Sequence, residues 1–481
     1  MNFNAFDWII VIAFISLTTG VAFLTRRFIS DYDSFLLAGR NLKLYLAMAT
    51  MGATELGLVT LMYFSQQGYA SGFAAFTVGV VSLVGFVFVG KTGFIIKGLR
   101  RLRCHTIAEF FGLRYNRSTQ IVAAVITFVA GMMNMGMFLV MGAKFLLYMV
   151  GFSPDQLTYV MVGLLLLVLA YTVVGGMVSV VLTDYIQFII LFTSVVLGTY
   201  FAVTHVGYER VVDTVQTQYG DGGFDPFVNP DLGWAFVVWI SIGAIFSGMW
   251  PPALSRALST TDSETTRKMY GFIGFSFLGR ALLPMMWGIC AFAYFQFEPT
   301  IPFPTEGGEL DTAAALAAMM STFDSYLLCW SSIFVNDIVV PLRPGITDRS
   351  KIKMTRIAVV VCGIFVLLWG YLYTPPETIF RFMMITGTMY SASVMLTAAM
   401  GLYWKKANSM GTFASLIVAG CLPLSAIFIK DASILPENLQ WMASDKSVGI
   451  ATYLLSLASI VVVSLLTQKK DPPKTLVYHE D

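Results

Sequence analysis

Long apolar runs, each about as long as a membrane is thick, constrain this chain more than any other feature of its sequence. A helix needs about 20 mostly apolar residues to cross the hydrocarbon core of a bilayer. Thirteen such runs start near residues 6, 41, 72, 119, 157, 177, 233, 270, 311, 354, 378, 409 and 447. Only 12% of the residues are charged, about half the fraction found in a soluble domain. The sequence therefore predicts an all-α polytopic membrane protein with 13 transmembrane helices.

The distribution of basic residues over the loops predicts the orientation of the chain in the membrane. Twenty-four Lys and Arg residues lie on one set of alternate loops and tails, and three (Arg210, Lys430 and Lys446) lie on the other set. Cytoplasmic loops carry the excess of basic residues, so we expect the N-terminus outside and the C-terminus in the cytoplasm. The first run has no basic residues before it and no small-residue cleavage pattern after it. We expect a retained helix of a multi-pass protein of the inner or plasma membrane.

Other functional classes lack their residues in this sequence. A net charge of +2 provides no broad basic face for nucleic acid. The five Cys residues are scattered and the three His residues fall outside the apolar runs, so no metal or nucleophile constellation is indicated and we do not expect an enzyme. The expected partners are a small-molecule substrate, a coupling ion and the lipid bilayer, with the oligomeric state left open.

A carboxylate lies in the middle of the second span. Glu55 belongs to the segment 52–57, with the sequence GATELG. A charge at this depth is costly unless it has a partner, and a glycine at each end indicates a helix that breaks and frees backbone carbonyls for a cation. The alternative is a continuous, close-packed helix in which Glu55 pairs with a basic residue such as Lys144 or Arg381. We expect the break, because intramembrane carboxylates are functional by default.

The ninth span carries hydroxyl groups at helical spacing. Ala318, Ser321, Thr322 and Ser325 recur at i, i+3, i+4 and i+7, which places three hydroxyls on one face. Asp324 lies at the edge of that face. Hydroxyls alone commonly bond carbonyls of their own helix, but oxygen ligands next to a carboxylate suit a hard cation. We expect a cation site here.

Two further features interrupt predicted helices. The glycine pair at 175–176 opens a helix whose second turn carries Asp184, for which an interhelical hydrogen bond is the alternative to a cation role. Trp250, followed by prolines at 251 and 252, breaks the seventh span, for which an interfacial Trp anchor is the alternative. The breaks in spans two and seven lie five helices apart. Interruptions in corresponding positions are typical of inverted-repeat transporters.

Together these features resemble the sodium/solute symporter family, which includes carriers for proline, sugars, sialic acid, pantothenate, choline and urea. The resemblance covers nearly the whole chain, and its segments are 35–40 (FLLAGR), 175–187, 256–258 (RAL), 320–325 (MSTFDS) with 337–338, and 401–411. It implies the LeuT-type fold, with two inverted five-helix repeats plus three peripheral helices.

The resemblance also implies how the chain is divided. A peripheral first helix with an inner loop would occupy residues 1–40, the first inverted repeat 41–202, and an external loop 203–232. The second inverted repeat would occupy 233–403, and two peripheral helices with a cytoplasmic tail 404–481. Most of the external loop shows no helical period.

Two cation sites are implied by the same resemblance. The first would bind sodium through the carbonyls of Ala53, Leu56 and Ala318 and the hydroxyls of Ser321 and Thr322. The second would use Asp184, Ser321, Asp324 and Ser325. The expected activity is sodium-coupled symport of a small organic solute, with Na⁺ as the coupling ion.

The resemblance places the substrate beside the break in the second span, and the residues expected at this site are Glu55, Gly57, Thr60, Asn134 and Trp250. A carboxylate next to an aromatic face favours an ammonium or guanidinium group, so an amine or amino acid suits this site better than a sugar. A sensory receptor that acts with a separate signalling partner is one alternative function. A proton-coupled carrier is another, although the sixth span lacks the Lys that replaces sodium in some carriers of the implied fold.

Overall fold

The computed structural model describes residues 5–297, 312–372, 379–429, 433 and 435–478. These residues form helices joined by short connections, and the strand-like pairing among them is an isolated bridge between Leu42 and Thr260. The helices of the first half are α1 (Ala5–Thr25), α2 (Tyr32–Leu37), α3 (Leu44–Glu55), α4 (Leu58–Ser71), α5 (Thr77–Thr92), α6 (Ile96–Arg101), α7 (Ile107–Arg114), α8 (Arg117–Val150), α9 (Leu157–Val206) and α10 (Tyr208–Tyr219).

The second half continues the same all-helical pattern. Its helices are α11 (Gly233–Ser247), α12 (Pro251–Leu258), α13 (Ser263–Phe297), α14 (Thr312–Ile333), α15 (Val340–Leu342), α16 (Asp348–Leu372), α17 (Ile379–Tyr390), α18 (Leu396–Tyr403), α19 (Ser409–Phe428) and α20 (Asp445–Thr467). Short π-helical turns at Phe334–Val339 and Ser391–Met395 join α14 to α15 and α17 to α18.

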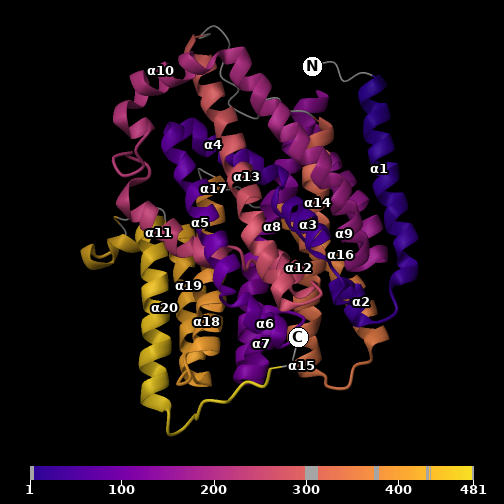
Figure 1. Ribbon diagram of the computed structural model, residues 1–481, viewed down its shortest axis with the longest axis vertical. Helices are drawn as coiled ribbons and strands as arrows, with labels where there is room; N and C mark the ends of the chain where they lie inside the picture. Colours follow the sequence, from indigo (N-terminus) through magenta and orange to yellow (C-terminus); the bar gives the residue numbers. More distant parts are fainter. Residues whose placement is uncertain (1–4, 298–311, 373–378, 430–432, 434, 479–481) are drawn as a thin grey trace.

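Membrane-spanning character is confirmed for most of the predicted runs. Among the described residues, 10 helical segments are long and apolar enough to cross a bilayer. Each of the thirteen predicted starts lies in or a few residues before a helix, and the second run corresponds to α3 and α4 together. The number of crossings stays a prediction. In Figure 1, α1 begins at the top of the bundle and α20 ends at the bottom, the end of the molecule that also carries the basic helix α6 and helix α7.

The predicted interruptions are present, each with a local cause. Helix α3 ends at Glu55, and α4 begins after Gly57, whose backbone is extended (φ −81°, ψ 160°). Helix α11 ends before Trp250, and α12 begins at the proline pair 251–252, where ring closure fixes φ and removes two N–H donors. Helix α9 kinks at Gly176, whose φ of 55° is a left-handed value that glycine adopts without strain.

Glycine also sets how closely the long helices approach. Helix α13 crosses α4 and α5, and a Cβ added at Gly288 would collide with the carbonyl oxygen of Ser65. A Cβ at Gly176 would lie 2.8 Å from the carbonyl oxygen of Phe35 on α2. Side-chain-free contacts of this kind let membrane helices pack backbone to backbone, which brings α3, α4, α9, α13 and α14 together around the break in the second span.

The external loop differs from the expectation of an irregular segment. Helix α9 runs on to Val206, and the 12-residue helix α10 follows it. Val211 and Val215 are buried against Ile289 and Ala293 of α13. Tyr208, Val211, Val212, Val215 and Tyr219 recur at i, i+3, i+4, i+7 and i+11, a helical period that the expectation of an irregular segment overlooked.

Candidate functional site

The break between α3 and α4 faces α14. The Thr322 hydroxyl donates to the Thr54 carbonyl oxygen at 3.1 Å. A Cβ added at Gly57 would lie 2.5 Å from Thr322 Oγ1, so only glycine leaves room for this hydroxyl. The Leu56 N–H returns to the Gly52 and Ala53 carbonyls at 3.1 and 3.2 Å, which closes α3 at the break. An oxygen-only set of this kind suits a hard cation.

Three of the residues predicted for the first sodium site therefore lie close together, and their binding of sodium stays a prediction. Ala53 and Leu56 lie at the end of α3, and Thr322 packs directly against the break. Ala318 and Ser321 belong to α14, but their side chains lie outside the described residues, so their roles stay predictions.

A second polar cluster lies one helical turn deeper. Asp184 Oδ2 accepts hydrogen bonds from Thr50 Oγ1 at 2.5 Å and from Thr54 Oγ1 at 3.2 Å. Arg256 Nη2 lies 3.3 Å from the same oxygen, and both charged side chains are fully buried. The Ser325 hydroxyl donates to Asp324 Oδ1 at 3.1 Å and accepts a hydrogen bond from Arg256 Nη2.

The structure thus brings together three members of the predicted second cation site, together with a residue that the prediction did not assign to it. Arg256 supplies a positive charge between Asp184 and Ser325, and Thr50 and Thr54 complete the contacts of the carboxylate. The two threonines stand at i and i+4 in the sequence, a spacing that indicates a shared face. Among the described residues, Asp184 Oδ1 and Asp324 Oδ2 have no hydrogen-bond partner, so both carboxylates keep capacity for another ligand.

Glu55 pairs with an arginine that the sequence analysis did not name. Arg280 Nη1, on α13, lies 3.2 Å from Glu55 Oε2 and 2.5 Å from the Glu55 carbonyl oxygen. The suggested partners are wrong because Arg381 pairs with Asp445 at 3.4 Å and Lys144 makes no ion pair in the described part of the chain. The guanidinium of Arg280 also lies 4.0 Å from the centroid of the Phe277 ring. Glycine-mediated packing of α13 against α4 brings Arg280 to the break.

Aromatic rings gather around Trp250, directly before α12. The Trp250 ring centroid lies 4.3 Å from that of Tyr390, 4.9 Å from Trp330 and 5.8 Å from Tyr326. Tyr326 lies one turn along α14 from Thr322, which bonds the Thr54 carbonyl, so these rings lie near the break between α3 and α4.

The remaining predicted substrate residues lie around the same region. The Thr60 hydroxyl donates to the Glu55 carbonyl oxygen at 3.4 Å. Asn134 Nδ2 donates to Thr386 Oγ1 at 3.1 Å, and Phe138, one turn along α8 from Asn134, packs on Tyr326 at 5.4 Å. Contact of all these residues with a solute stays a prediction.

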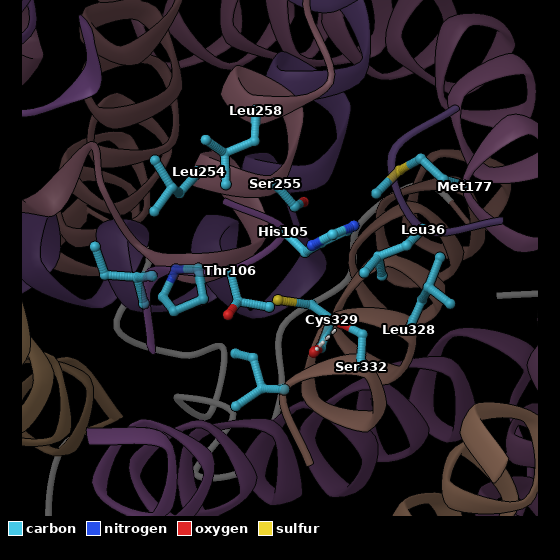
Figure 2. Close-up of a pocket in the computed structure, with 13 residues that line it drawn as sticks. Leu36, His105, Thr106, Met177, Leu254, Ser255, Leu258, Leu328, Cys329 and Ser332 are labelled. Carbon is cyan, nitrogen blue, oxygen red and sulfur yellow. Dashed lines mark hydrogen bonds between the residues drawn. The ribbon is translucent and has the colours of Figure 1, made fainter. Parts of the chain in front are cut away.

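A small cavity lies between the cluster around Arg256 and the end of the molecule that carries α6 and α7. Its volume is about 20 Å³, room for about one water molecule. Figure 2 shows His105, Met177, Cys329 and Ser255 around it, contributed by the segment before α7 and by α9, α14 and α12. Arg256 Nη1 donates to Ser255 Oγ at 3.0 Å, so the cavity begins directly beside the buried ion pair.

On the side of α6 and α7, the cavity is closed by an ionic cluster of His105, Asp33 and Glu109. His105 Nε2 lies 2.8 Å from Asp33 Oδ1, and its Nδ1 lies 2.9 Å from Glu109 Oε2. Burial alone would lower the pKa of His105, but the hydrogen bonds to the two carboxylates raise it from 6.5 to about 9. The bond from His105 is the main reason that the pKa of Asp33 falls to about 2. The cluster therefore carries a charged imidazolium at neutral pH.

This cluster predicts a pH dependence of stability. Because the folded-state pKa of His105 lies above the ordinary value, its contribution is complete below pH 6.5 and is lost as the pH rises through about 9. We expect the melting temperature of the purified protein to fall over this range, and the fall to be smaller in His105→Gln. Parallel profiles for the two proteins, measured by a thermal-shift assay, would show that His105 does not act in this way.

Comparison with known proteins identifies the family to which the chain is similar. The chain matches the sodium:solute symporter family over residues 35–307 and 308–419. It is 24% identical to a sodium/glucose cotransporter of Vibrio parahaemolyticus, over 92% of this chain and 86% of that protein. It is 23% identical to the osmoregulated proline transporter OpuE of Bacillus subtilis, over 92% of this chain and 90% of that protein.

Solved structures show the fold. A substrate-bound, outward-open Na⁺-coupled sialic acid symporter superposes with a TM-score of 0.81 at 18% identity, covering 99% of this chain and 100% of that one. Mhp1, a nucleobase-cation-symport-1 family transporter, superposes with a TM-score of 0.54 at 11% identity, covering 91% and 95%. The predicted LeuT-type fold is confirmed. The chain belongs to the sodium:solute symporter family, a family of sodium-coupled transporters and not of enzymes.

Proposed function

We propose that the break between α3 and α4 binds the coupling sodium ion and that a small organic solute binds beside it. The observation that carries this proposal is the Thr322 hydroxyl of α14, which lies 3.1 Å from the Thr54 carbonyl oxygen where α3 ends. Carbonyls and hydroxyls replace the water that a sodium ion gives up, and a broken helix supplies them without leaving its own hydrogen bonds unmade at the membrane midplane. The predicted ligands are the carbonyls of Ala53, Leu56 and Ala318 and the hydroxyls of Ser321 and Thr322.

The transport cycle follows from the two interrupted elements. Breaks at α3–α4 and α11–α12 occupy corresponding positions of the proposed inverted repeats, residues 41–202 and 233–403. Motion of one repeat against the other around a site at their interface would expose that site to each side in turn. We propose that the end carrying α6, α7 and the His105 cluster is cytoplasmic, because the basic loops belong to it.

The deeper cluster suggests how a second cation would bind. In the conformation described, Arg256 holds the positive charge between Asp184 and Ser325. We propose that sodium enters this cluster only when the guanidinium moves away, and that Asp324 and Ser325 then contact the ion. Sodium activation of transport with a Hill coefficient near 1 would indicate that Arg256 remains the resident cation. A coefficient near 2 that falls in Asp184→Asn would indicate a second sodium.

A thermal-shift experiment on the purified protein tests the sodium proposal. Sodium chloride should raise the melting temperature in a saturable manner, because an ion that binds only the folded state stabilises it by mass action. Potassium and choline chloride at the same ionic strength should not. Equal shifts with sodium and potassium would contradict specific sodium binding.

A further inference from the structure

Glu55 and Arg280 form a charge pair that is incomplete on the carboxylate side. Glu55 Oε2 and its backbone carbonyl contact Arg280, while Oε1 has no hydrogen-bond partner among the described residues. The Glu55 side chain is only 9% exposed and that of Arg280 17%. A buried carboxylate oxygen without a partner carries a desolvation cost, which a donor arriving with a ligand would remove.

Charge balance restricts which ligand can open this pair. A neutral sugar inserted between the two groups would leave two buried charges without a full partner, which is costly in a low-dielectric interior. A simple amine would pair with Glu55 and leave Arg280 with a backbone carbonyl alone. A simple carboxylate would pair with Arg280 and leave Glu55 unpaired.

We propose that the solute is a zwitterion, with a cationic nitrogen for Glu55 and a carboxylate for Arg280. Such a ligand exchanges one ion pair for two and leaves no net charge in the site. The inference rests on the proposed function, since it concerns the solute that moves with sodium. It also revises the expectation of an amine, which took account of Glu55 but not of Arg280.

The aromatic residues fit the cationic end of such a ligand. The Trp250 ring centroid lies 4.3 Å from that of Tyr390 and 5.8 Å from that of Tyr326. Tyr326 in turn lies one turn along α14 from Thr322, which bonds the carbonyl next to Glu55. A cation held by Glu55 would therefore lie near aromatic faces, and cation–π contact would add to its binding. The guanidinium of Arg280 is held over the Phe277 ring at 4.0 Å, which orients it as a planar fork that suits a carboxylate.

Sets of isosteres test the charge requirement in the wild-type protein. One set is L-proline, pyrrolidine (the amine alone) and cyclopentanecarboxylate (the carboxylate alone). A second set is glycine betaine, choline and 3,3-dimethylbutyrate, and the screen also includes the other amino acids and glucose. In sodium buffer, we expect at least one zwitterion to raise the melting temperature and to bind at least 10-fold more tightly than either of its isosteres. A stronger effect of glucose, of an amine or of a carboxylate, or no effect of any zwitterion, would overturn the proposal.

Two variants test whether Arg280 binds the carboxylate of the solute and whether Glu55 binds its cationic nitrogen. Arg280→Gln should weaken zwitterion binding about 10- to 100-fold, the range for losing a hydrogen bond to a charged group, and should remove the preference over the amine isostere. Glu55→Gln should remove the preference over the carboxylate isostere. Arg267→Gln, which breaks an exposed pair with Glu264 on the same helix, is the matched control.

The stabilisation by sodium alone separates this proposal from the proposed function. If Arg280→Gln retains the sodium shift but binds zwitterions as the wild type does, the zwitterion proposal fails and sodium coupling stands. If the wild type shows no sodium shift, the proposed function fails whatever the isosteres do. The isostere series needs no variant, so it decides the question even where a variant does not fold.

Discussion

Asp184→Asn is expected to lower the free energy of unfolding by about 3–5 kcal/mol, the cost of removing one partner of a buried ion pair. The substitution leaves the fully buried Arg256 without its carboxylate, and a guanidinium cannot neutralise itself by releasing a proton. Arg256→Met should cost less, because a buried carboxylate that loses its partner can take up a proton. Chemical denaturation or the melting temperature in detergent measures the difference.

A double-mutant cycle isolates the pair. The combined variant Asp184→Asn/Arg256→Met should be more stable than the sum of the single losses predicts, because residues in direct contact couple. Arg267→Gln is again the control; it removes an exposed ion pair and a hydrogen bond to the Gly90 carbonyl, so we expect a much smaller loss than for Asp184→Asn. Strictly additive losses, or an Asp184→Asn protein as stable as the wild type, would show that the ion pair contributes little to the fold.

Thr322→Val should weaken the apparent sodium affinity about 10- to 100-fold, the effect of losing one polar contact to a charged group. Valine keeps the shape of threonine but cannot offer oxygen to an ion at the α3–α4 break. Sodium titration of the melting temperature measures the affinity. The melting temperature without sodium should change little, because the hydroxyl makes one hydrogen bond, to the Thr54 carbonyl.

Thr204→Val provides the matched control for this substitution. The Thr204 hydroxyl bonds carbonyls of its own helix, those of Tyr200 and Phe201, and lies at an exposed end of α9. The sodium affinity of the Thr204→Val protein should equal that of the wild type. If Thr322→Val and Thr204→Val both bind sodium as the wild type does, the α14 hydroxyl is not a ligand and the first site lies elsewhere.

Local chemistry explains why the breaks could be predicted. Gly57 and the prolines at 251–252 interrupt helices through their own backbone geometry. The residue types alone therefore predict the two breaks. The facing hydroxyl of Thr322 could also be predicted, since helical spacing fixes its face. The pairing of the break with this hydroxyl face was not evident from the residues themselves and was implied by the resemblance to the sodium/solute symporter family.

The partners of the buried charges could not be predicted, because they depend on how distant helices pack. Glu55 and Arg280 are 225 residues apart, and Asp184 and Arg256 are 72 apart. Both arginines were visible in the sequence, but no periodic pattern links them to their carboxylates. Close packing of α13 on α4 and α5 decides the first pair. Helix α10 is a different case, because its apolar residues recur at helical spacing and the helix could have been predicted.

Equilibrium binding of radioactive sodium to the purified protein tests the central claim most directly. We predict saturable binding that potassium does not displace, that a zwitterionic solute strengthens, and that Thr322→Val weakens at least 10-fold while Thr204→Val leaves it unchanged. Binding that potassium displaces equally well, or that is the same in Thr322→Val as in the wild type, would contradict a sodium site at the break between α3 and α4.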